Sequence, residues 1–170
     1  DDSTSLVQMT ALVVSGLLEM QTLGFSINDV VLEAAIDYLI ARQDQNGGWA
    51  FEYGYGSELE STAYIVHALL QNENLTSETT TAIENALNRI EALWVSEDSR
   101  SAYTASLWYL AIHASDYTNP ALETELIDYL KTSKVISSDA VYWTYPDEAW
   151  GYYNLGGSVE ITAYAIQALA

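Results

Sequence analysis

The sequence predicts an all-α fold in which two kinds of helix alternate along the chain and pack in two layers. One kind is an apolar run that follows a Thr-Ala pair, and it recurs four times. The other kind is an amphipathic run with one apolar face, found in each of the three intervals between those runs. We therefore expect seven helices that alternate between an inner and an outer layer, starting and ending with an inner one, and we expect no strand.

The inner helices are predicted from the four Thr-Ala runs. The run at residues 102–114, AYTASLWYLAIHA, is apolar around nearly its whole circumference, so a helix there needs cover on every side. The four pairs are spaced to give a repeat of about 50 residues; they begin at Thr10, Thr62, Thr104 and Thr162. An offset of 100 aligns the second run with the fourth, and it also pairs Glu60 with Glu160. Such internal similarity predicts a repeat of helix pairs.

The outer helices are predicted at residues 31–43, 82–94 and 120–133, where apolar side chains recur every three or four positions. The middle segment shows the pattern most clearly, with a stripe of Ile83, Leu87, Ile90 and Trp94. The tetrapeptide Ile-Asp-Tyr-Leu occurs in both the first and the third of these segments, at residues 36–39 and 127–130. These helices are expected to bury one face and expose the other.

Capping residues predict where the outer helices begin. Ser26, with an acidic residue three positions later, precedes the first outer helix, and Ser77 precedes the second. Asn119 followed by Pro120 is typical of a helix cap and first helical residue, and it precedes the third.

The turn between the first outer helix and the second inner helix is unusually aromatic. It reads QDQNGGWAFEYGY over residues 43–55, and Gly47-Gly48 lets the backbone reverse at positive φ. We expect Trp49 and its neighbours to fold back over the helix ends and to bury a large apolar area there. A related aromatic segment, EAWGYYNLGG at residues 148–157, precedes the last inner helix. Before it, the acidic loop at residues 139–148 carries Tyr142, Trp143 and Tyr145; it could bind a cation or a sugar, but we favour a solvated loop held by its aromatic side chains.

Charge and composition exclude several classes of function. Twenty-four acidic and five basic residues give a net charge of −19, which argues against a nucleic acid or an anionic membrane as partner. No stretch reaches the roughly 18 apolar residues of a membrane span. The chain has no cysteine, so disulfides, thiolate metal sites and cysteine nucleophiles are excluded for these 170 residues.

The pattern resembles the α/α-toroid superfamily, which includes terpenoid cyclases, prenyltransferase β-subunits and the thioester-containing domains of α2-macroglobulin and complement proteins. YLIARQDQNGGWA looks like the superfamily's repeat turn. The closer similarity is to the macroglobulin and complement domain, because SAYTASLWYLAI, ELIDYLKTS, a Trp-x-x-Pro stretch and SVEITAYAIQALA follow the order of that domain's C-terminal half. The resemblance covers residues 5–170, and it predicts one α/α-toroid domain, or a fragment of one, over residues 1–170.

One feature of that family is missing. Its Cys-Gly-Glu-Gln thioester motif has no counterpart here, so this chain cannot form the thioester. In the family the motif lies upstream of the region that this chain resembles, so truncation and loss of the motif both remain open. The resemblance implies a non-catalytic module of a secreted or cell-surface protein that engages other domains or other proteins.

Three groups of side chains could have a catalytic or metal-binding role, but for each of them we favour a structural interpretation. Glu60 and Glu160 could be the acid pair of a polysaccharide-cleaving α/α barrel, but carboxylates in a first helical turn also stabilise the helix dipole. His67 and His113 could contribute to a zinc site, but two histidines without cysteine favour core residues. The turn at residues 44–48 is oxygen-rich like a calcium loop, yet it lacks the carboxylate that should follow.

The sequence therefore favours a non-enzymatic role without cofactor, metal or catalytic residues. Two alternatives stay open: an α/α-barrel or cyclase-like enzyme, and a scaffold subunit that self-associates through its apolar chain ends. For the favoured role we expect contacts with a ligand or partner at six residues, namely Trp49, Tyr55, Glu60, Trp143, Trp150 and Glu160.

Overall fold

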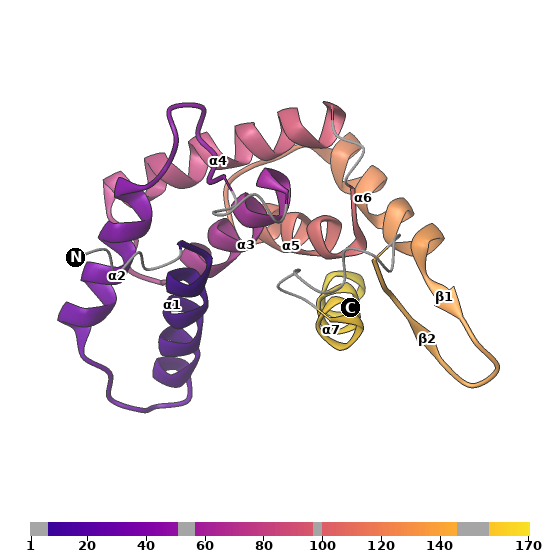
Figure 1. Ribbon diagram of the computed structural model, residues 1–170, viewed down its shortest axis with the longest axis horizontal. Coiled ribbons are helices and arrows are strands. Elements are labelled where there is room, and N and C mark those ends of the chain that lie inside the picture. The colour runs from indigo at the N-terminus through magenta and orange to yellow at the C-terminus, as the bar shows by residue number, and fades with distance from the viewer. Residues whose placement is uncertain (1–6, 51–56, 97–99, 146–156) are drawn as a thin grey trace. The chain divides into compact units, whose positions relative to one another are not determined.

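The computed structural model describes residues 7–50, 57–96, 100–145 and 157–170, and it confirms the predicted all-α fold and the order of helices. The described helices are α1 (Val7–Thr22), α2 (Asp29–Ala41), α3 (Glu58–Leu70), α4 (Ser77–Ser96), α5 (Ala102–His113), α6 (Pro120–Ser133) and α7 (Ser158–Leu169) (Figure 1). α2, α4 and α6 are the predicted outer helices, and the other four are the predicted inner helices.

The chain divides into two compact units, Asp1–Val95 and Ser96–Ala170. In the first unit, α1 packs against both α2 and α3. In the second unit, α5 packs against both α6 and α7. Each unit thus contains the predicted contact between an inner and an outer helix, whereas a single domain over residues 1–170 stays a prediction.

Burial confirms the two predicted kinds of helix in the middle of the chain. α3 is buried without a break from Leu59 to Val66, and α5 from Ala102 to Trp108. The outer helices bury only a stripe, and the stripe predicted for α4 is buried at all four of its positions. The stripes of the other two outer helices are Leu32, Ile36 and Leu39 in α2, and Leu122, Leu126 and Leu130 in α6.

The prediction that every inner helix is covered on all sides was wrong for α1 and α7, the first and last of these helices. In α1 one face is buried, whereas Leu12 and Val13 are about half-exposed at 48% and 52%. In α7, Val159 is 87% exposed although Leu59, its counterpart in the offset-100 repeat, is fully buried. The sequences of α3 and α7 are closely similar, so the difference lies in the neighbours that each helix has and not in its own residues.

The predicted start signals were right once and wrong twice. Asn119 caps α6 as predicted, because its side chain accepts a hydrogen bond from the first turn. The cap of α2 is Asn28 and not Ser26. The side chain that accepts a first-turn amide proton of α4 belongs to Thr76 and not to Ser77. In both cases the capping side chain is the polar one directly before the first helical residue, which is the position from which it can reach the free amides.

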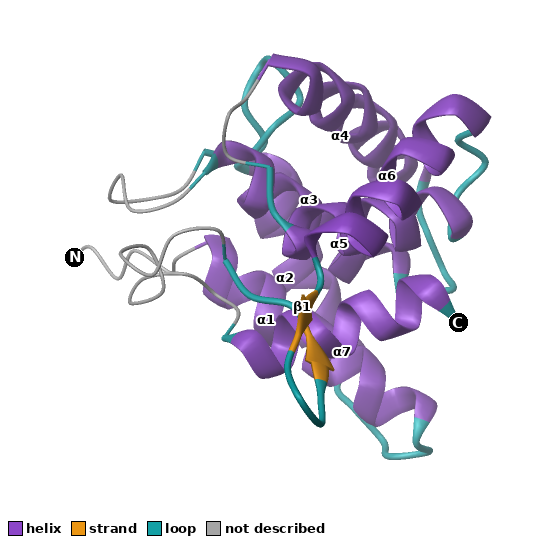
Figure 2. Ribbon diagram, turned by 90° about the vertical axis from the view of Figure 1, so that its right-hand side faces the viewer, coloured by secondary structure: helices purple, strands orange, loops and turns teal. Residues whose placement is uncertain are grey.

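A short hairpin that the sequence analysis did not predict follows α6. Its strands are β1 (Val135–Ile136) and β2 (Val141–Tyr142), which pair antiparallel (Figure 2). β-branched residues on both sides of a four-residue turn, three of whose residues are polar, are the sequence signal for this hairpin. The strands are only two residues long, so the periodicity that identifies longer strands could not reveal them.

Candidate functional site

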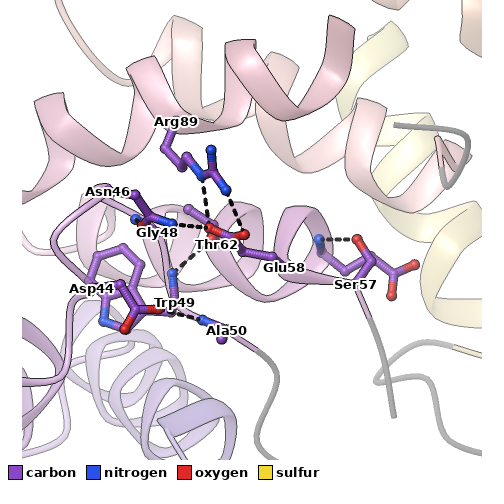
Figure 3. A network of polar contacts seen from close by, with 10 residues as sticks. Asp44, Asn46, Gly48, Trp49, Ala50, Ser57, Glu58, Thr62 and Arg89 are labelled. Atoms are coloured by element: carbon purple, nitrogen blue, oxygen red, sulfur yellow. Dashed lines mark hydrogen bonds and ion pairs between the residues drawn. The ribbon is translucent and has the colours of Figure 1, made fainter. Parts of the chain in front are cut away.

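The first candidate site is the connection from α2 to α3, where Trp49 joins the two helices. Its indole Nε1 donates a hydrogen bond to the Leu39 carbonyl near the end of α2, at 2.8 Å. Its backbone N–H donates to the Thr62 hydroxyl in α3, at 3.0 Å (Figure 3). The Trp49 side chain is buried at 1% exposure, which confirms that this aromatic folds back over the helix ends.

The connection from α6 to α7 repeats the same arrangement in the second unit. Trp143 Nε1 donates to the Leu130 carbonyl at 2.8 Å, and the Trp143 backbone N–H donates to the Thr162 hydroxyl at 3.1 Å. Trp143 is also buried, with 5% exposure. We call Trp49, Leu39 and Thr62 the first clasp, and Trp143, Leu130 and Thr162 the second clasp.

The two clasps explain the repeats in the sequence. The last residue of each Ile-Asp-Tyr-Leu tetrapeptide supplies the carbonyl, and the threonine of each following Thr-Ala pair supplies the hydroxyl. Each clasp therefore ties an outer helix to the next inner helix through one buried tryptophan. Binding of a ligand or partner by these tryptophans stays a prediction, and the predicted contacts at Tyr55 and Trp150 lie outside the described residues.

The glycine turn of the first connection packs closely on α4. Gly47 has φ 90°, as predicted for this turn. A Cβ atom added to Gly47 would lie 2.6 Å from the backbone oxygen of Asn85. Gln43 braces the turn, because its side-chain nitrogen donates to the carbonyls of Gly47 and Ala82, both at 2.8 Å. The turn thus needs glycine at position 47 both for its backbone angle and for space.

Beside this turn, Glu58 and Arg89 form an ion pair that the sequence analysis did not identify. Arg89 Nε and Nη2 donate to the two carboxylate oxygens of Glu58, each at 2.8 Å (Figure 3). The Asn46 side chain donates to the same carboxylate at 3.1 Å. These hydrogen bonds and the charge of Arg89 lower the pKa of Glu58, and partial burial opposes them. Thirty-one positions separate the partners, so local sequence patterns could not have indicated the pair.

The oxygen-rich turn at residues 44–48 uses its side-chain oxygens to hold the backbone. The Asp44 carboxylate accepts a hydrogen bond from the Ala50 amide at 3.3 Å, and the Asn46 side-chain oxygen accepts one from the Gly48 amide at 2.9 Å. This supports the interpretation as a plain turn. Within the described ranges, no group of three or more histidine or acidic side chains is placed to hold a metal ion.

Glu60 and Glu160 occupy the third position of α3 and α7, in the first turn as predicted. Glu60 is 7% exposed, and its backbone N–H donates to the Ser57 hydroxyl that caps the helix. Burial raises the pKa of Glu160, and the nearby Tyr103 hydroxyl partly offsets this shift. The two carboxylates belong to different compact units.

The histidines differ in environment. The His67 side chain in α3 is half-buried, and desolvation lowers its pKa to about 4, which supports the core interpretation for this residue. The core interpretation was wrong for His113. Its side chain at the end of α5 is 53% exposed, and its Nε2 lies 3.8 Å from a carboxylate oxygen of Glu123. The two histidines also belong to different units.

Comparison with known protein families gives a match over nearly the whole chain. The family model described as the A-macroglobulin TED domain matches residues 2–170, as the resemblance to the thioester-containing domain predicted. No curated protein matches the chain. Among the helices in the described ranges, none combines the length and the apolar character that crossing a membrane requires.

Proposed function

Because this chain belongs to the A-macroglobulin TED domain family, we propose that it acts as a non-catalytic interaction module of a larger macroglobulin-like protein. The observation that carries the proposal is the match over residues 2–170 in a chain without cysteine. The chain supplies the helical scaffold of the family, but it cannot supply the sulfur atom of a thioester. Its contribution to the larger protein is therefore a set of surfaces that bind other domains or other proteins.

The local chemistry of the carboxylates supports a non-catalytic role. Glu58 is neutralised by Arg89, which donates two hydrogen bonds to its carboxylate. A glycoside-cleaving pair needs one protonated acid and one carboxylate placed on either side of a sugar. Glu60 and Glu160 instead occupy the same first-turn position of two equivalent helices, where acidic residues stabilise the helix.

A turnover assay tests the non-catalytic part of this proposal. The whole chain and its Glu60→Gln and Glu160→Gln variants are incubated with a panel of soluble polysaccharides, and reducing ends are measured. We expect no turnover above the buffer control for any of the three proteins. Turnover that falls at least about a hundredfold on either substitution would overturn the proposal in favour of an acid-base enzyme.

The coding sequence around this segment tests the proposal that the chain is one module of a larger protein. We expect the reading frame around this segment to encode β-sandwich domains on its flanks, as in the α2-macroglobulin and complement proteins that the sequence resembles. A Cys-Gly-Glu-Gln stretch shortly upstream would show that the thioester is supplied by the same protein. A flanking polysaccharide-acting catalytic domain would contradict the assignment.

We extend the proposal to location, and place the protein outside the cell or on its surface. The family resemblance supports this, and the surplus of acidic residues suits a solvated surface. Antibodies against the chain should detect it in the medium or on intact cells of the source organism. Detection only after cell lysis would overturn the location.

A further inference from the structure

The β1–β2 hairpin is fixed at its base by the second clasp. Trp143 directly follows β2, and its hydrogen bonds to Leu130 and Thr162 hold that end of the hairpin against α6 and α7. β2 itself also packs against α7. At the other end, the Ser137 amide donates to the Ala140 carbonyl at 2.9 Å and closes the turn. The hairpin therefore has a rigid base, and its tip extends away from the helices of its unit (Figure 1).

The outer edge of β1 has a free hydrogen-bonding position at Ile136. Hydrogen-bonded and non-hydrogen-bonded pairs alternate in an antiparallel ladder, and Ser137 is hydrogen-bonded to Ala140. The next pair, Ile136 with Val141, is thus the non-hydrogen-bonded kind, in which the backbone N–H and C=O of Ile136 point away from β2. No residue of the described chain forms a hydrogen bond with these two groups. They can accept another strand.

The side chains beside this edge form an exposed apolar pair. Ile136 is 69% exposed and Val141 is 51% exposed, and the two lie directly opposite each other in the ladder. Cross-strand β-branched pairs of this kind pack well against a further β-branched or aromatic side chain on the same face. The backbone edge and the apolar pair therefore favour the same kind of ligand, an extended peptide segment.

Positive charge at the base of β1 specifies that segment further. The chain has only five basic residues, and the three arginines have partners within it: Glu58 for Arg89, Glu125 for Arg100 and the ring of Tyr38 for Arg42. Lys131 and Lys134 are both exposed, and neither forms an ion pair with a described residue. The backbone of Lys134 is extended (φ −64°, ψ 142°), so its side chain lies on the same face as that of Ile136, two residues later.

From this geometry we propose that β1 binds, as a third strand, an extended acidic segment of a partner protein. In an antiparallel third strand, the residue opposite Lys134 lies two positions after the residue opposite Ile136. The segment that fits best has a β-branched residue, any residue and then a carboxylate, which places the carboxylate at Lys134. This inference rests on the proposed function as an interaction module and names one of its surfaces.

The test uses the whole ¹⁵N-labelled chain and a short capped peptide with the core Thr-Val-Thr-Glu-Glu. We expect saturable chemical-shift changes centred on the Ile136 amide. Lys131→Gln with Lys134→Gln should weaken binding roughly tenfold at low salt, as two lost surface ion pairs predict. The control variant, Arg42→Gln with Arg100→Gln, removes the same charge elsewhere and should bind nearly as well as the unmodified chain.

Two further peptides separate strand addition from simple charge attraction. A peptide with N-methyl groups on the amides of both the valine and the second threonine keeps the charge but cannot form the ladder hydrogen bond to Ile136 in either register, and it should lose binding. A peptide with lysines in place of the glutamates should also fail to bind. Equal binding of all peptides, no shift at Ile136, or hairpin-dependent dimers in light scattering would each overturn the inference. Such a failure leaves the module proposal intact, because the turnover assay and the gene test it separately.

Discussion

Glu58 and Arg89 meet in a two-point ion pair, with both nitrogen-oxygen distances at 2.8 Å. The pair joins the first turn of α3 to α4 beside the glycine turn, within the first compact unit. The two side chains keep 22% and 27% exposure, so solvent screens part of their attraction. The geometry, which suits a planar guanidinium and a carboxylate, holds three segments of the chain in register.

The coupling of this pair should be measurable in a double-mutant cycle. Glu58→Gln and Arg89→Met, alone and together, should give a coupling free energy of about 1 kcal/mol in urea unfolding at neutral pH. The coupling should shrink in molar salt, because salt screens exposed charges. Arg100 and Glu125 provide a control, since they lie 3.3 Å apart with the carboxylate 52% exposed and should couple more weakly. Zero coupling between Glu58 and Arg89 at low salt would contradict the prediction.

The same pair predicts a pH dependence of stability. Because the folded-state pKa of Glu58 is lowered from the ordinary value of 4.5, its contribution to the free energy of unfolding is complete above that value. The contribution is lost as the pH falls from about 4.5 through the lowered pKa. Arg89→Met should flatten the pH profile of unfolding in this window and leave the slope above pH 6 unchanged.

Each clasp includes one threonine hydroxyl, and removing that hydroxyl should lower the free energy of unfolding. Thr62→Val keeps the shape of the side chain but leaves the buried Trp49 amide without its acceptor, which should cost about 1–3 kcal/mol of unfolding free energy. Thr162→Val should have a similar effect through Trp143 in the second unit. Thr80→Val serves as control, because that hydroxyl is exposed and donates to the carbonyl of Thr76, directly before its own helix. A loss no larger than that of the control would show that the clasp is not stabilising.

Two glycines at positive φ separate backbone strain from steric clash. Gly24 (φ 85°) has no atom near an added Cβ, whereas at Gly47 (φ 90°) the Asn85 backbone oxygen would lie 2.6 Å away. Gly24→Ala should therefore cost about 1 kcal/mol, from the backbone angle alone. Gly47→Ala should cost about 1–3 kcal/mol more, because α4 or the turn must move. Thermal and urea unfolding of both variants measure the difference, and equal costs would mean that the turn does not pack tightly on α4.

His67 should make the protein less stable in mild acid. Its pKa is about 4 in the folded chain and about 6.5 when exposed, so the unfolded state binds more protons between these values and stability falls as the pH drops from 6.5 to 4. The full loss from this group is about 3 kcal/mol. His67→Gln, which introduces the residue found at the equivalent position 167 in α7, should remove that slope. The matched variant His113→Gln should keep it, since His113 is exposed.

The sequence by itself determined the helices, their order and the chemical character of their faces. Helical periodicity is local, so the stripe from Ile83 to Trp94 could be predicted as buried without knowing what covers it. The repeat also indicated that Trp49 packs at a connection and that Glu60 and Glu160 occupy first helical turns. The family followed from the ordered motifs, and the match over residues 2–170 confirmed it.

Only the tertiary structure decided which distant groups meet. Helix packing brought three groups within hydrogen-bonding distance of their partners: the Leu39 carbonyl, the Thr62 hydroxyl and the Arg89 guanidinium. The same packing left His67 half-buried and His113 exposed, although both lie on predicted inner helices. A hydrogen bond or an ion pair depends on distances of a few ångströms between residues far apart in the chain, and such distances are set by how helices pack and not by local periodicity.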